Sequence, residues 1–296
     1  MTSGGAGVVL GKAWRWAGCG DGVRRGVTSG RTRSAIGPSH GVTLPIMLVA
    51  AAVCPCPPLL VPDVAAGAAP ELDAARAACT DALGVLAAAR PDRLVVVGPA
   101  EQSGRGPHSE GARGTFRGFG VDLDVRLGRN GPRTAEGPAA GSEPVEGADR
   151  PLPPSLAVAA WLLGRTDWSD APVEGLGVGE PLAAERCIQS GREIATRAER
   201  VALLVMGDAS ACRTLKAPGY LDDRAAGFDA AVAQALGTAD VAALQALDAE
   251  LAYELKASGR APWQVLAGAG EGAGLAGALL YEDAPYGVGY VVAAWS

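Results

Sequence analysis

Histidine is scarce in this 296-residue sequence, which contains only His40 and His108. Histidine is the usual general base near neutral pH and a frequent metal ligand. His40 lies in an N-terminal segment rich in Gly, Ser and Arg, and His108 lies in GRGPHSEG, which predicts a loop. Neither histidine is therefore expected on a strand end. The shortage disfavours hydrolases that activate a serine through histidine, because that nucleophile needs an adjacent base.

Long apolar runs and clusters of basic side chains are also missing. No run reaches the roughly 18 apolar residues that span a bilayer, so no membrane partner is expected. The net charge is −6, and the acidic body lacks the clustered Lys and Arg that phosphate binding needs. Nucleic acid is therefore not expected as a partner.

The six cysteines have no repeated spacing. This pattern favours reduced thiols in a cytoplasmic protein over a disulfide framework. Cys54 and Cys56 form a CxC pair, but no second Cys or His pair accompanies them, so a structural zinc site is not favoured.

The first 46 residues differ from the rest in charge and pattern. They carry +5, whereas the remaining residues carry −11, and they show no apolar periodicity. We interpret residues 1–46 as an arm or as non-native upstream sequence, with Met47 as the first residue of the fold. The alternative is a secretory leader, because arginines precede an apolar run that ends at Cys54.

The body of the chain has the pattern of an α/β domain over residues 47–296. Three apolar runs, at residues 47–53, 93–98 and 201–207, predict buried parallel strands. Helical patterns at residues 70–89 and 181–197 fall between them. We expect a mixed, mostly parallel sheet covered by helices on both faces.

The remaining segments predict a strand, a loop, two helices and a closing pair of strands. Alternating apolar residues predict a strand over residues 114–128, and residues 129–154, dense in Gly and Pro, predict a flexible loop. Helices are expected over residues 222–236 and 241–258, and the two strands flank a turn at Pro285. GAGEGAG (268–274) follows a helical pattern, so it is not interpreted as a dinucleotide fingerprint.

Short motifs after the apolar runs resemble those of a known family. Ligands of open α/β sheets bind beyond the carboxyl ends of the strands, which here means residues 54–58, 98–104 and 207–213. CPCPPLLVP, LVVVGP, LLVMGDASACR and APYGVGY, in this order, resemble the LigB-like family of class III extradiol ring-cleavage dioxygenases and the related Memo-like proteins. The resemblance covers residues 47–296 and rests on the order of the motifs.

The resemblance implies Fe(II)-dependent cleavage of a catecholic ring by O₂. It also implies iron ligands of two histidines and a glutamate, with a further histidine as acid and base. In this sequence Cys56 stands where the first motif histidine is expected, Ala100 and Glu101 follow the second strand, and Ala211 stands at the third histidine position. The usual iron site cannot be assembled from these residues.

Other side chains offer substitutes for the missing ligands. Cys56, Asp208 and either Glu101 or Glu271 are competent metal ligands, whereas the competing interpretation makes Cys56 a small core residue. Asp208 and Ser210 are the catalytic candidates. The alternatives are that Asp208 caps a turn and that Ser210 caps a helix or turn.

Residues 213–229 contain many polar groups just beyond a strand end. Arg213 and Lys216, with Tyr286 from the final turn, are candidates for binding a small aromatic or anionic ligand. A solvated loop with Asp222 as a helix N-cap, and Tyr286 in the core, is the alternative.

Two functional hypotheses follow. The resemblance implies a ring-cleaving dioxygenase with Fe(II) as its cofactor. The residues themselves favour a non-catalytic protein on the same fold that holds no cofactor. Such a protein would bind a small molecule, a partner subunit or another copy of itself.

Overall fold

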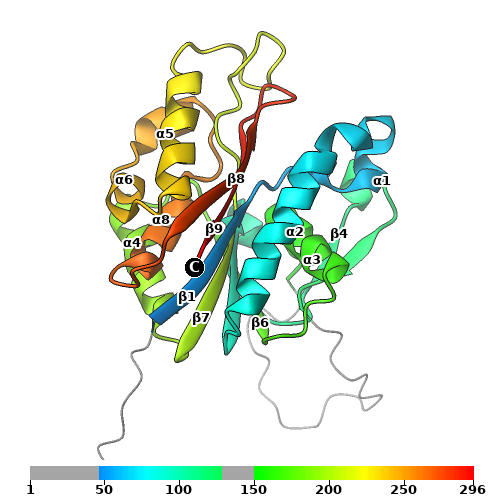
Figure 1. Ribbon diagram of the computed structural model, residues 1–296. Coiled ribbons are helices and arrows are strands. Elements are labelled where there is room, and N and C mark those ends of the chain that lie inside the picture. Colours follow the sequence, from blue (N-terminus) through cyan, green and yellow to red (C-terminus); the bar gives the residue numbers. More distant parts are fainter. Residues whose placement is uncertain (1–46, 129–149) are drawn as a thin grey trace, which may run out of the picture. The chain divides into compact units, whose positions relative to one another are not determined.

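Seven strands form one mixed sheet in the computed structural model, which describes residues 47–128 and 150–296 (Figure 1). The strand order is β3-β6-β2-β7-β1-β9-β8. The four strands from β6 to β1 are parallel, whereas β3, β9 and β8 pair antiparallel with their neighbours. In chain order the strands are β1 (Met47–Cys54), β2 (Arg93–Pro99), β3 (Gly106–His108), β6 (Val173–Val178), β7 (Arg200–Met206), β8 (Gly277–Asp283) and β9 (Tyr290–Trp295).

Helices cover both faces of the sheet, which confirms the predicted α/β fold (Figure 1). The side chains of β1 alternate, with Ala50 and Ala52 in one core and Ala51 and Val53 in the other. Helices α2 (Asp73–Ala88) and α3 (Pro154–Arg165) pack on the first face. Helices α4 (Ala184–Ala195), α5 (Ala225–Gly237) and α8 (Arg260–Gly270) pack on the second.

Three predicted parallel strands are present as β1, β2 and β7, and the closing pair of strands is present as β8 and β9. The helix expected over residues 70–89 begins at Asp73, because Pro70 lies in a preceding 3₁₀ turn over Ala66–Leu72. The helices expected over residues 181–197 and 222–236 are α4 and α5.

Two predicted elements are wrong in form. The strand expected over residues 114–128 is a hairpin of β4 (Arg113–Thr115) and β5 (Asp124–Arg126), interrupted by a 3₁₀ turn at Arg117–Phe119 and a left-handed Gly120. The helix expected over residues 241–258 is broken into α6 (Val241–Gln245) and α7 (Ala249–Glu254), because the Asp248 carboxylate caps the second helix.

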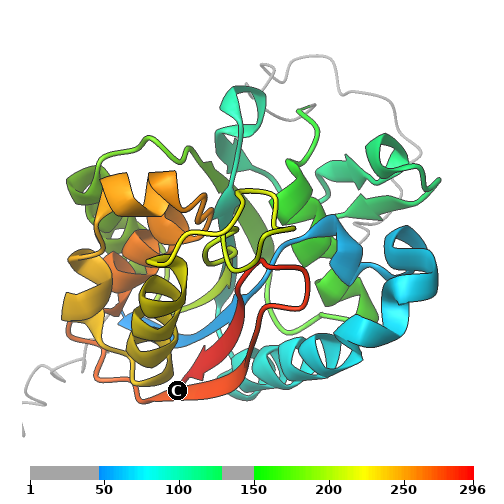
Figure 2. The same cartoon turned by 90° about the horizontal axis from the view of Figure 1, so that it is seen from above.

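The loops after the parallel strands position the candidate site. Those after β1 and β7, the former containing the short helix α1 (Pro62–Ala65), lie at the upper edge of the sheet in Figure 1 and face the viewer in Figure 2. Residues 1–46, including His40, and residues 129–149 of the expected loop lie outside the described residues. Within the described part, every helix is too short or too polar to cross a membrane.

Candidate functional site

A cleft of about 710 Å³ lies at the carboxyl edge of the sheet, where α/β proteins bind ligands. One wall is apolar and is built from the end of β2 and the segment before α3. It consists of Pro99, Ala100, Pro151, Leu152, Pro153 and Pro154. The charged side chains of the cleft are Glu101, Arg105, Arg150 and Glu180. This combination suits an organic molecule that has both an apolar and a polar part.

Cys56 lines this cleft and pairs with Asp208. The backbone N–H of Cys56 donates to Asp208 Oδ1 at 2.8 Å, and the thiol lies 3.8 Å from Oδ2. The backbone of Asp208 is fixed by the Ser258 hydroxyl, which accepts its N–H, and by the N–H of Gly259, which donates to its carbonyl. The Asp208 carboxylate therefore binds the backbone just after β1, a neighbouring strand, instead of capping the turn in which Asp208 itself lies.

Burial favours the neutral forms of this pair. Burial and the adjacent Asp208 carboxylate raise the pKa of the Cys56 thiol well above its ordinary value. Burial raises the pKa of Asp208 to about 6, although the two hydrogen bonds from Cys56 oppose the shift. A protonated thiol is a poor nucleophile and a poor metal ligand.

Glu271, one of the two side chains proposed as a third metal ligand, does not join the pair. Glu271 lies at the end of α8, where Arg192 binds both of its carboxylate oxygens at 2.7 Å and Gln245 donates to it. Arg192 accordingly lowers the pKa of Glu271. Among the residues that the structure describes, no three His, Cys, Asp or Glu side chains gather to hold a metal ion. The donor set of Cys56, Asp208 and Glu271 does not fit Fe(II).

Ser210 and Arg213 converge on a buried carboxylate that the sequence patterns do not single out. Asp229, on α5, accepts the backbone N–H and the hydroxyl of Ser210 at 2.8 and 2.9 Å. Arg213 Nη1 donates to the same carboxylate at 2.9 Å. Ser210 is buried, its hydroxyl is held in this network and it does not line the cleft, and the charge of Arg213 is compensated by Asp229.

The other predicted ligand-binding residues lie on neighbouring loops but outside the cleft. The backbone N–H of Arg213 donates to Gly287, which joins the loop carrying Lys216 to the turn carrying Tyr286. Burial and the nearby Glu71 carboxylate raise the pKa of Tyr286. None of Arg213, Lys216 and Tyr286 lines the cleft.

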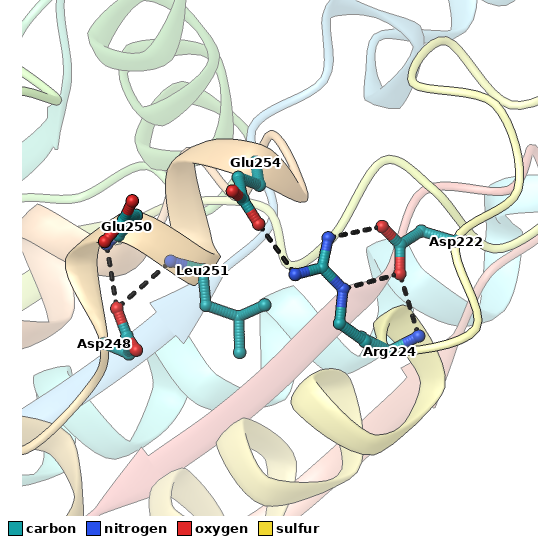
Figure 3. A network of polar contacts seen from close by, with 6 residues as sticks. All are labelled: Asp222, Arg224, Asp248, Glu250, Leu251 and Glu254. Carbon is teal, nitrogen blue, oxygen red and sulfur yellow. Dashed lines mark hydrogen bonds and ion pairs between the residues drawn. The ribbon is translucent and has the colours of Figure 1, made fainter.

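The 213–224 loop is fastened to α7 by Arg224, as Figure 3 shows. Its guanidinium contacts Asp222 and Glu254, each at 2.7 Å. Asp222 also accepts the backbone N–H of Arg224, so it caps the turn before α5, whose N-cap position is Arg224 itself. Asp222 and Arg224 thus hold this loop in place.

His108 is not in a loop as expected. It ends edge strand β3 and is 1% exposed, with Nε2 donating to the Gly104 carbonyl at 2.8 Å. Burial, reinforced by the positive charge of Arg150, lowers its pKa. The ring faces the protein interior and does not line the cleft.

Arg105 and Arg150 line the cleft although the sequence patterns do not predict them as ligand-binding residues. The segment predicted to bind ligands after the second strand ends at Gly104, one residue short of Arg105, and Arg150 falls in the expected loop. The sequence could have indicated Arg105 as a cleft residue, because its segment follows a parallel strand. The sequence gives no such indication for Arg150, because 45 residues separate the two arginines.

Comparisons with known proteins leave the family open. No family model matches the chain, and no curated protein matches it. Among solved structures, it is similar to an uncharacterized protein from Escherichia coli K12, with a TM-score of 0.42 and 16% sequence identity. That match covers 84% of this chain and 100% of the other. A likeness of this degree carries no functional conclusion.

Proposed function

We propose that this chain is a divergent relative of the LigB-like class III extradiol dioxygenases that binds a small organic molecule without iron-dependent ring cleavage. The family part of the proposal rests on the order of the short motifs after β1, β2 and β7. The binding part rests on the cleft at the carboxyl edge. A reducing compartment is consistent with the five described cysteines, all of which are free thiols.

The observation that carries the proposal is the pairing of Cys56 with Asp208 beside an apolar cleft. The two side chains that a substituted metal site would use bind each other instead. The cleft retains a volume in the range of small-molecule sites, which is roughly 300–1,000 Å³. Ligand binding therefore needs no metal in this proposal.

Binding in the cleft is tested by titrating the full chain with 8-anilinonaphthalene-1-sulfonate, whose fluorescence rises in apolar sites. Ser103 is exposed and lines the cleft, so Ser103→Trp should fill it. The adjacent Gln102 is exposed in the same turn but does not line the cleft, which makes Gln102→Trp the matched control. We expect Ser103→Trp to abolish the fluorescence increase and Gln102→Trp to keep it. Equal binding by both variants would contradict the proposal.

The second candidate function is ring cleavage at a substituted metal site, favoured by the position of Cys56 on the cleft wall. Oxygen uptake with a panel of catechols and Fe(II) separates the two functions. We expect no uptake above that of free Fe(II). Uptake that is lost in Cys56→Ala would favour the enzyme.

A further inference from the structure

Two arginines on the cleft wall form no ion pair with an acidic side chain in the part of the chain that the structure describes. Arg105 and Arg150 both line the cleft. Neither takes part in any of the ion pairs formed among the described residues. In a chain of net charge −6, two arginines without an ion pair among the described residues, both lining one cleft, are an unusual arrangement. A guanidinium keeps its charge at every physiological pH, so the arrangement attracts anions.

Backbone carbonyls hold both guanidinium groups without cancelling their charge. Arg150 donates through Nη1 to the carbonyl of Arg105 and through Nη2 to that of Pro107 at 3.2 Å. Arg105 makes one longer bond, from Nε to the carbonyl of Ala100 at 3.4 Å. The Nε atom of Arg150 is buried and has no hydrogen-bond partner in the described structure. The Arg150 side chain is thus anchored on the backbone of Arg105, and both guanidinium groups retain donors for a ligand.

Gly179 gives the Arg105 guanidinium room. A Cβ at Gly179 would lie 2.7 Å from Cζ of Arg105, closer than side chains tolerate. Gly106 has φ +102°, a conformation that favours glycine, and a Cβ there would lie 3.6 Å from Nη2 of Arg150. A larger residue at position 179 would therefore have to displace the Arg105 guanidinium, whereas a Cβ at position 106 would make only ordinary contact with Arg150.

The acidic residues of the cleft do not cancel this charge. Glu180 lies 3.5 Å from Arg260, a buried arginine behind the cleft that also donates to the Glu180 carbonyl. Glu101 takes part in none of the ion pairs among the described residues. Neither glutamate therefore pairs with Arg105 or Arg150 among the described residues.

We propose that the cleft selects organic carboxylates, with the carboxylate held by Arg105 and Arg150 and the apolar body packed on the proline-rich wall. This inference rests on the proposed function, because it names the chemical class of the cleft's ligand. Two guanidinium groups match the two oxygens of a carboxylate with charge-assisted hydrogen bonds. The proline rings and Leu152 offer a flat apolar surface for an aromatic or aliphatic body.

The test compares two probes of the same shape, 2-naphthoate and its uncharged amide 2-naphthamide, by calorimetric titration of the full chain. We expect naphthoate to bind at least about tenfold more tightly than naphthamide, because only the anion gains charge-assisted bonds. Arg105→Gln and Arg150→Gln should each weaken naphthoate about tenfold and leave naphthamide unchanged. Arg90, exposed before the amino end of β2, provides the control, and Arg90→Gln should change neither affinity.

The outcomes distinguish this inference from the function on which it rests. Equal affinities for the two probes, with Ser103→Trp abolishing both, would overturn carboxylate selection and leave cleft binding intact. Failure of both probes to bind would count against cleft binding itself. Should Arg150→Gln lower the urea midpoint, Arg105→Gln decides the matter, since its single long hydrogen bond contributes little to the fold.

Discussion

At the scale of single residues, the carboxylates of Asp208, after β7, and Asp229, in α5, have opposite electrostatic surroundings. No cationic side chain among the described residues pairs with Asp208, which binds the neutral Cys56, so burial pushes it toward its protonated form. Asp229 is buried but receives the charge of Arg213 and two bonds from Ser210. Their different surroundings predict different responses to mutation.

Asp208→Asn should stabilise the protein in a pH-dependent way. The folded pKa of about 6 lies above the ordinary 3.8, so the folded state holds this proton more tightly. The carboxyl contributes its full stability below about pH 4 and loses it as the pH rises through 6. Asparagine does not ionise and can still accept the Cys56 N–H. In urea denaturation we expect the free energy of unfolding of the variant, relative to that of wild type, to rise by about 2–3 kcal/mol as the pH increases from about 4 to about 6. A gain that does not change with pH would show that Asp208 is not perturbed.

Asp229→Ala should be strongly destabilising. It leaves the buried polar groups of Ser210 and the guanidinium of Arg213 without partners, at a cost of about 3–5 kcal/mol. Asp229→Asn is the matched control. Its amide oxygen still accepts from Ser210, so we expect a loss of about 1–2 kcal/mol. Chemical denaturation of the two variants measures the difference in the free energy of unfolding. Equal losses would indicate that the hydrogen bonds of Asp229 add nothing to stability beyond the volume that its side chain fills.

At the scale of elements, α4 and α8 cross at unusually close range. A Cβ at Gly191 would overlap the Val265 carbonyl, and one at Gly268 would overlap the Ile188 carbonyl. The GAGEGAG stretch thus begins with Gly268, which lets two helices pack closely, rather than with a phosphate-binding loop. This contact holds α8 in place, and its N-cap Gly259 binds the Asp208 carbonyl.

Gly268→Ala should separate α4 from α8 and cost about 1–3 kcal/mol through overpacking. Gly84 supplies the control, because it lies within α2 with nothing near its missing Cβ. Gly84→Ala should stabilise the protein by about 0.5–1 kcal/mol, since alanine favours helix. Thermal unfolding would give shifts of opposite sign, and two shifts of the same sign would contradict the close helix contact.

The elements that the sequence predicts correctly are those with continuous apolar runs. Strands β1, β2 and β7 are buried on both faces, which gives such runs directly. Strand β6, VEGLGV, lacks this signal because it contains two glycines and a glutamate that ion-pairs with Arg93 and Arg197. Helix α3 is hidden because it begins within a run of prolines. The hairpin of β4 and β5 resembles one strand because its alternation continues through the turn.

At the scale of the whole molecule, the carboxyl edge of the sheet can be located from sequence, but the partners across it cannot. Cys56 and Asp208 are both expected there, and they bind each other over a separation of 152 residues. Arg213 and Glu271 are predicted to bind ligands, yet their charges are compensated by Asp229 and Arg192. Such pairings depend on how distant elements pack, which single-sequence patterns do not specify.

The iron content of the full chain, after anaerobic reconstitution with Fe(II) and removal of loosely bound metal, decides between ligand binding without iron and a substituted metal centre. Because Cys56 and Asp208 bind each other and no third ligand joins them among the described residues, we predict iron well below one atom per chain. Iron near one atom per chain that disappears in Cys56→Ala would contradict the account and establish a substituted metal centre.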